Sequence, residues 1–122
     1  MKFQNAYSVV VDFELGAPQG SVLSPFLFNV IMNEILQIES ANTDKLSFAD
    51  DLAYLIIGKF NLRSKIKRVL KESERLFIKY GLKVNFEKTK IIIFGQKNRQ
   101  SYYLFDTEIK KVRQYCYFGC YF

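Results

Sequence analysis

The chain has 122 residues, of which 49% are hydrophobic and 25% charged, with 18 Lys+Arg against 12 Asp+Glu. This length and composition are typical of one folded globular domain and exclude a disordered or low-complexity chain. The sequence contains no His. It therefore excludes imidazole metal sites and Ser-His or Cys-His nucleophile systems built from this chain alone, so a metal ion would need oxygen ligands.

The charges are unevenly distributed along the chain. Residues 1–58 hold two basic and seven acidic residues, whereas residues 59–122 hold 16 basic and five acidic residues. A carboxylate-bearing half beside a basic half suits a phosphate-handling enzyme, which holds metal ions and a polyanion together. A solvated surface produces the same pattern, and charge alone leaves both interpretations open.

Cysteine usage and apolar runs limit the class of protein further. Cys116 and Cys120 match neither a disulfide framework nor a metal-binding pair, so we expect two small buried side chains. Ser24, Pro25 and Asn29 interrupt the most apolar stretch, and we therefore expect neither a signal peptide nor a membrane span.

The first elements are a strand and a helix. Residues 7–13 form an apolar, β-branched run that predicts a strand, and it ends in a glycine-containing turn at residues 16–20. Ser24 is expected to cap the following helix, with Pro25 at its first position. Residues 26–38 are apolar on most faces, which predicts a buried helix.

Two adjacent aspartates separate the next two apolar segments. Residues 46–49 and 52–57 read as strands joined at Asp50 and Asp51, which predicts a hairpin with both carboxylates at its tip. Hard cations such as Mg²⁺ bind through one or two carboxylates together with substrate phosphates. Aspartates are also frequent in turns for local reasons, so the pair alone is weak evidence for a metal site.

A second helix is expected after Asn61, its predicted N-cap, and before Gly81, its predicted stop. Its apolar positions have helical spacing; they are Ile66, Val69, Leu70, Leu76, Phe77 and Tyr80. Its opposite face is basic, carrying Arg68, Lys71, Arg75 and Lys79. We favour a solvated face for this stripe over direct contact with nucleic acid.

The remaining chain predicts short strands. They are expected at residues 82–84 and 91–94, around a polar turn at 85–89, and at residues 102–105, 108–112 and 115–122. The order of strand, helix, hairpin, helix and strands favours an α+β fold with helices on one face of a mostly antiparallel sheet.

Four motifs occur in order along this framework: GAPQGSVLSPFLFN at residues 16–29, FADD at 48–51, GLKVNFEKTK at 81–90 and YFG at 117–119. Together they closely resemble the palm of a reverse transcriptase, in particular the enzymes of non-LTR (LINE-type) retrotransposons. The resemblance covers about residues 14–122. It implies a polymerase palm, which is a ferredoxin-like α+β fold, and RNA-directed DNA polymerisation by two-metal phosphoryl transfer.

The resemblance also implies roles for particular residues. Asp50 would be a catalytic metal ligand, and Asp51 would support the same catalytic metal site. Nucleotide or template binding is implied for Pro18, Gln19, Gly20, Ser21, Phe48 and Lys88. A primer grip is implied for Tyr117, Phe118 and Gly119. Plain structural interpretations stay open: a strand-to-helix turn at residues 16–20, a surface lysine at 88, and core packing of the two aromatics, which we favour for Phe118.

In relatives, a further catalytic aspartate lies on an earlier strand. We therefore expect residues 1–122 to be a partial palm domain that lacks this strand, the fingers and the thumb, and that does not polymerise DNA alone. Asp12 is a weak candidate substitute for the absent carboxylate.

In the complete enzyme, Mg²⁺ or Mn²⁺, an RNA template, a DNA primer and deoxynucleoside triphosphates would take part. The family implies a nuclear or cytoplasmic location and no membrane. Two alternatives are a catalytically dead, nucleic-acid-binding remnant of a retroelement and a translated fossil that folds poorly.

Overall fold

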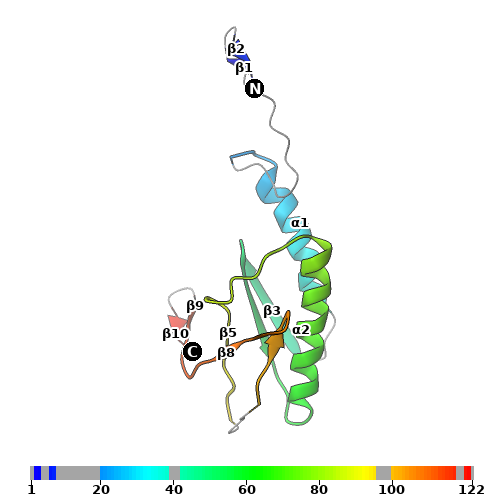
Figure 1. Cartoon of the computed structure of the whole chain (residues 1–122), viewed down its shortest axis with the longest axis vertical. Helices are drawn as coiled ribbons and strands as arrows, with labels where there is room; N and C mark the ends of the chain where they lie inside the picture. Colours follow the sequence, from blue (N-terminus) through cyan, green and yellow to red (C-terminus); the bar gives the residue numbers. More distant parts are fainter. Residues whose placement is uncertain are drawn as a thin grey trace.

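The computed structural model describes residues 20–38, 42–95 and 100–117 with their side chains, and the backbone alone at 2–3, 6–7 and 120–121. The helices are α1 (Ser24–Leu36) and α2 (Leu62–Lys79). The strands are β1 (Lys2–Phe3), β2 (Ala6–Tyr7), β3 (Thr43–Phe48), β4 (Asp51–Ile56), β5 (Lys90–Ile91), β6 (Tyr103–Leu104), β7 (Thr107–Glu108), β8 (Lys110–Lys111), β9 (Cys116–Tyr117) and β10 (Cys120–Tyr121). The fold is therefore mixed α+β, as predicted (Figure 1).

The described strands form five two-stranded ladders, where a single sheet was expected. Four ladders are antiparallel, namely β1-β2, β3-β4, β6-β7 and β9-β10, whereas β5 and β8 pair in parallel. Only β3 and β4 are long, and all six residues of β3 pair with β4. The expected strand at residues 82–84 is absent, and the one expected at 91–94 is limited to Lys90–Ile91, which pairs with the two residues of β8.

Both helices pack on one face of the β3-β4 hairpin. Paired residues of an antiparallel ladder share a face, and Lys45 pairs with Tyr54. Lys45 contacts the C-terminal end of α1, since its Nζ donates to the carbonyl of Leu36 at 2.7 Å and to that of Ile38. Tyr54 contacts α2 through a hydrogen bond with Ser73. The predicted placement of two helices on one face is thus confirmed for this hairpin.

The hydrophobic core lies between the helices and the hairpin. Its buried members are Met32, Ile35, Ile38 and Leu76, with Leu52, Phe77 and Leu82 packed around them. From α1, the C-terminal half supplies the buried residues, and Phe28 packs against them from the first half. The first turns of α1 stand clear of α2 and the hairpin in Figure 1, so that Phe26, Leu27 and Val30 are exposed by half or more. The expectation of a buried helix is therefore wrong for this half.

The ends of α2 match the sequence signals closely. Asn61 occupies the predicted N-cap position, although its side chain makes no capping bond. At the other end, Gly81 has a φ of 63°. Its amide donates to the carbonyl of Ile78, and the amide of Leu82 donates to that of Phe77. This is a Schellman motif, in which a left-handed glycine ends the helix. In α1, by contrast, the N-cap is Leu23 and not Ser24.

Candidate functional site

The β3-β4 hairpin ends in a two-residue loop that contains the first aspartate of the predicted pair. Phe48 pairs with Asp51, which leaves Ala49 and Asp50 as the loop. Ala49 has a φ of 50°, in the left-handed region that L-residues adopt at a cost. The prediction that both aspartates form the turn is therefore half right, because Asp51 is already the first residue of β4. Both carboxylates are exposed.

The two faces of this hairpin differ in their surroundings. Its inner face is anchored by Lys45 and Tyr54, as described above, so the hairpin is held against both helices. Its outer face carries Leu46, Phe48 and Leu55, which are 59%, 67% and 53% exposed. Asp51 lies on this outer face, since its partner is Phe48 and paired residues share a face. The outer face is thus an open, largely apolar surface that ends at a carboxylate.

Lys88 lies in a turn that Asn85 organises. The Asn85 side-chain oxygen accepts the backbone amides of Glu87 at 3.0 Å and Lys88 at 3.2 Å. Its backbone carbonyl accepts both the amide and the hydroxyl of Thr89, at 3.0 and 2.8 Å. Such side-chain bonds to the following backbone stabilise turns strongly. The predicted polar turn is therefore confirmed, and it presents an exposed Lys88.

Of two tyrosines near the C-terminus, one bonds to this turn and the other is influenced by the charge of Asp51. The Tyr115 hydroxyl donates to the carbonyl of Lys88 at 3.1 Å. The pKa of Tyr117 is raised by burial first, and then by the negative charge of Asp51 and by Tyr115. A negative charge in the surroundings disfavours the ionised phenolate, which is the direction of this effect. Sequence reasoning missed Tyr115, for which the available signal was its spacing of two residues from Tyr117 in an extended segment.

The structure describes only some of the remaining predicted site residues. Pro18, Gln19, Phe118 and Gly119 lie outside the described residues, as does Asp12. Gly20 has a φ of 83° and leads into α1, where the Ser21 hydroxyl accepts the amide of Leu23 at 3.3 Å. Within the described part of the chain, no hydrogen bond or ion pair joins Gly20 or Ser21 to the two aspartates. Cys116, expected to be buried, is exposed.

The donor set at the hairpin tip suits a hard divalent cation but is incomplete. Carboxylate oxygens are the ligands that Mg²⁺ prefers, and substrate phosphates and water complete its shell. Asp50 and Asp51 provide two such groups. Across residues 20–38, 42–95 and 100–117, no three His, Cys, Asp or Glu side chains come together closely enough to hold a metal ion. These residues therefore fit one part of a metal site, with a further ligand needed from elsewhere.

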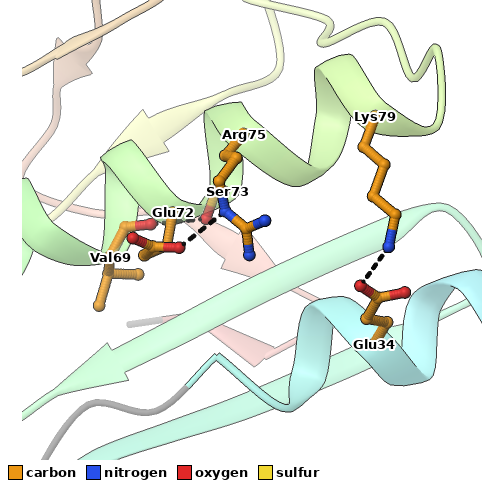
Figure 2. Close-up of polar contacts among 6 residues, drawn as sticks. All are labelled: Glu34, Val69, Glu72, Ser73, Arg75 and Lys79. Carbon is orange, nitrogen blue, oxygen red and sulfur yellow. Dashed lines mark hydrogen bonds and ion pairs between the residues drawn. The ribbon is translucent and has the colours of Figure 1, made fainter.

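The basic face of α2 is exposed, and some of its charges are paired. Figure 2 shows Arg75 beside Glu72, with an ion-pair distance of 3.1 Å, and Lys79 beside Glu34 of α1, at 2.7 Å. Arg68 and Lys71 are also exposed. Exposed ion pairs contribute little to stability, but these carboxylates reduce the charge available to a polyanion. The arrangement favours the solvated-face interpretation of this stripe.

None of the helices in the described residues is long and apolar enough to cross a membrane.

Comparisons with known proteins give the same family as the four sequence motifs. Residues 2–122 match the family described as "Reverse transcriptase (RNA-dependent DNA polymerase)". Over 87 residues the chain is 36% identical to a retrovirus-related Pol polyprotein from type-1 retrotransposable element R1 2 of Nasonia vitripennis, covering 67% of this chain and 21% of that polyprotein. It is 34% identical over 70 residues to the corresponding R1 polyprotein of the same organism, covering 57% of this chain and 20% of that polyprotein. No solved structure matches.

The chain spans about a fifth of the length of the curated relatives it matches. The family match and these relatives confirm the resemblance that the four motifs carried.

Proposed function

The chain belongs to the reverse transcriptase family, and from that membership we propose that it is part of the palm domain of an RNA-directed DNA polymerase of a non-LTR retrotransposon. In this proposal residues 1–122 form a partial palm, of the ferredoxin-like type with helices on one side of the sheet. The complete enzyme acts on an RNA template, a DNA primer and deoxynucleoside triphosphates. The partial domain does not polymerise DNA alone.

One observation supports this proposal most strongly: the C-terminal segment is bonded to the Lys88 turn. Tyr115 donates to the backbone carbonyl of Lys88, and the charge of Asp51 contributes to the raised pKa of Tyr117, two residues further. These residues come from the hairpin tip, the Asn85 turn and the C-terminal segment, which are far apart in sequence. A site for a metal-bound triphosphate and a primer end requires a carboxylate, a cation and aromatic side chains, and these segments supply all three residue types.

Each residue has a distinct task in the proposed mechanism. Asp50 and Asp51 hold Mg²⁺ or Mn²⁺, which supplies charge neutralisation for the triphosphate and activation of the primer hydroxyl when bound. Lys88 presents a positive charge to the phosphates from a turn with a fixed backbone. Tyr117, with Phe118 and Gly119, supports the primer end beside Asp51. The tip residue Phe48 faces the substrate side of the hairpin.

The loop before α1 has a further role in this proposal. Pro18, Gln19, Gly20 and Ser21 contribute to the nucleotide and template pocket. Glycine at a positive φ lets the backbone approach a substrate closely, and Gly20 has this conformation with open space around it. A helix N-terminus also favours nearby negative charge.

Binding of Mn²⁺ with dTTP tests the site assignment in the chain as it stands. We expect Mn²⁺ to broaden the amide NMR signals of Asp50, Asp51 and Lys88, and the D50N/D51N double variant to abolish this broadening. D44N is the matched control, because Asp44 is exposed on the outer face of the same hairpin but pairs with Leu55, away from the tip. Equal broadening in D50N/D51N and wild type would refute the metal assignment.

A second candidate function is a catalytically dead, nucleic-acid-binding remnant. It is favoured by the lack of a third carboxylate near Asp50 and Asp51 among the described residues and by the basic second half of the chain. Its signature would be salt-dependent binding to a primer-template that is independent of Mg²⁺ and unchanged in D50N/D51N. Primer extension that disappears in D50A would instead show that the isolated chain is active, against both expectations.

A further inference from the structure

Tyr115 occupies a position that no motif assigns and that the fold nevertheless connects to the site. Its hydroxyl donates to the carbonyl of Lys88, 27 residues away in sequence. The amide of Lys88 is held from the other side by the Asn85 side chain. The backbone of Lys88 is thus bonded at both its donor and its acceptor, once within its own turn and once from the C-terminal segment.

Tyr115 and Tyr117 act on the same side of an extended segment. Residues two apart on an extended strand point to the same face, and Tyr115 contributes to the raised pKa of Tyr117. The bond from Tyr115 to the Lys88 carbonyl is therefore the contact that joins this segment to the Lys88 turn.

We propose that Tyr115 is a positioning residue that fixes the backbone of Lys88 through its hydrogen bond to the Lys88 carbonyl. This inference rests on the proposed function, in which Lys88 faces the triphosphate held at Asp50 and Asp51. A lysine on an unanchored turn would sample many positions, and a point charge that moves by an ångström or more contributes much less to binding a specific phosphate. The Tyr115 bond restricts the Lys88 backbone, so that the Lys88 ammonium samples fewer positions.

The first test is local and uses amide hydrogen exchange in the full 122-residue chain. Y115F deletes only the hydroxyl and keeps the ring. We expect the amides of Glu87, Lys88 and Thr89 to exchange about five- to tenfold faster in Y115F, as one lost hydrogen bond implies, with α2 unchanged. Y103F is the control, because Tyr103 is 54% exposed on β6, outside this segment. Unchanged exchange at residues 87–89 would overturn the inference.

The second test separates positioning from a merely structural role. The affinity for Mn²⁺ with dTTP is measured in Y115F, K88Q and the double variant. If Tyr115 acts through Lys88, both single variants weaken binding several-fold and the double variant is no weaker than K88Q alone. Independent, additive losses, or a Y115F affinity equal to wild type while K88Q is weakened, would overturn the inference and leave the proposed function standing. An unchanged K88Q affinity would instead refute the role of Lys88 in the proposed function, and with it this inference.

Discussion

Replacing Ser73 by alanine removes the acceptor on which the half-buried Tyr54 hydroxyl depends. The Ser73 hydroxyl carries a single proton, which it donates to the Val69 carbonyl at 2.8 Å (Figure 2). In the contact of 2.8 Å with Tyr54, it must therefore be the acceptor, and Tyr54 the donor. This direction makes the two partners unequal, because Ser73 keeps a bond when Tyr54 loses its hydroxyl, whereas Tyr54 loses its acceptor when Ser73 is replaced.

The magnitudes follow from this asymmetry. Y54F deletes one hydrogen bond and should lower the free energy of unfolding by about 0.5–1.5 kcal/mol. S73A leaves a half-buried donor without its acceptor, at about 1–3 kcal/mol, offset by roughly 0.5 kcal/mol because alanine is the better helix former. Once Tyr54 is phenylalanine, however, S73A no longer strands a donor. It should then be neutral or slightly stabilising, so the double variant is no less stable than Y54F.

Urea unfolding of the wild type, both single variants and the double variant measures this cycle. We expect a coupling of about 1–2 kcal/mol between the two positions. Additive effects of the two substitutions would refute the donor assignment.

The stability of the protein at alkaline pH provides a second check, because burial raises the pKa of Tyr54 above its ordinary 10.0. A raised pKa means that the neutral phenol is favoured by folding, so this stabilisation is complete below pH 10 and is lost as pH rises through the folded pKa. Y54F should therefore lose less stability than wild type at high pH.

Three further outcomes are expected. A49G should raise the free energy of unfolding by about 0.5–1 kcal/mol in urea, because relief of the left-handed strain at φ 50° exceeds the entropy cost of glycine; a loss of stability would contradict this. K45M should lower the free energy of unfolding by about 1–3 kcal/mol, because two charge-assisted bonds to carbonyls at the end of α1 are lost while the aliphatic part of the side chain is kept. An unchanged thermal midpoint would argue against this role of Lys45. D51N should lower the pKa of Tyr117 toward its ordinary value by removing the nearby negative charge, as measured by NMR titration of ring-labelled tyrosine; an unchanged pKa would separate Tyr117 from the hairpin tip.

Local signals predicted the parts of the fold that depend on neighbouring residues. The period of α2 and its stop at Gly81 are properties of one segment, and both are confirmed. The hairpin around the two aspartates was also predicted, within one residue at its tip. The start of α1 was misplaced by one residue, because Leu23 is the N-cap and Ser24 is already the first helical residue.

Features that depend on distant partners could not be predicted in the same way. Apolar residues on all faces of α1 suggested full burial, but burial requires a covering element, and the first turns of α1 extend beyond α2 and the hairpin. Residues 82–84 have strand-like composition and form no ladder in the described chain. The bond from Tyr115 to Lys88 joins segments 27 residues apart, and neither segment contains a local signal of the other. The roles of Asp50, Asp51 and Lys88 stay predictions.

Glu34 connects the two helices through contacts that no local sequence pattern predicts. Its carboxylate accepts from Lys79 at 2.7 Å and from the Tyr80 hydroxyl, directly before Gly81 reverses the chain toward the Lys88 turn. This one side chain in the last turns of α1 therefore fastens that helix to the C-terminal end of α2, at the residues where the chain leaves the helix.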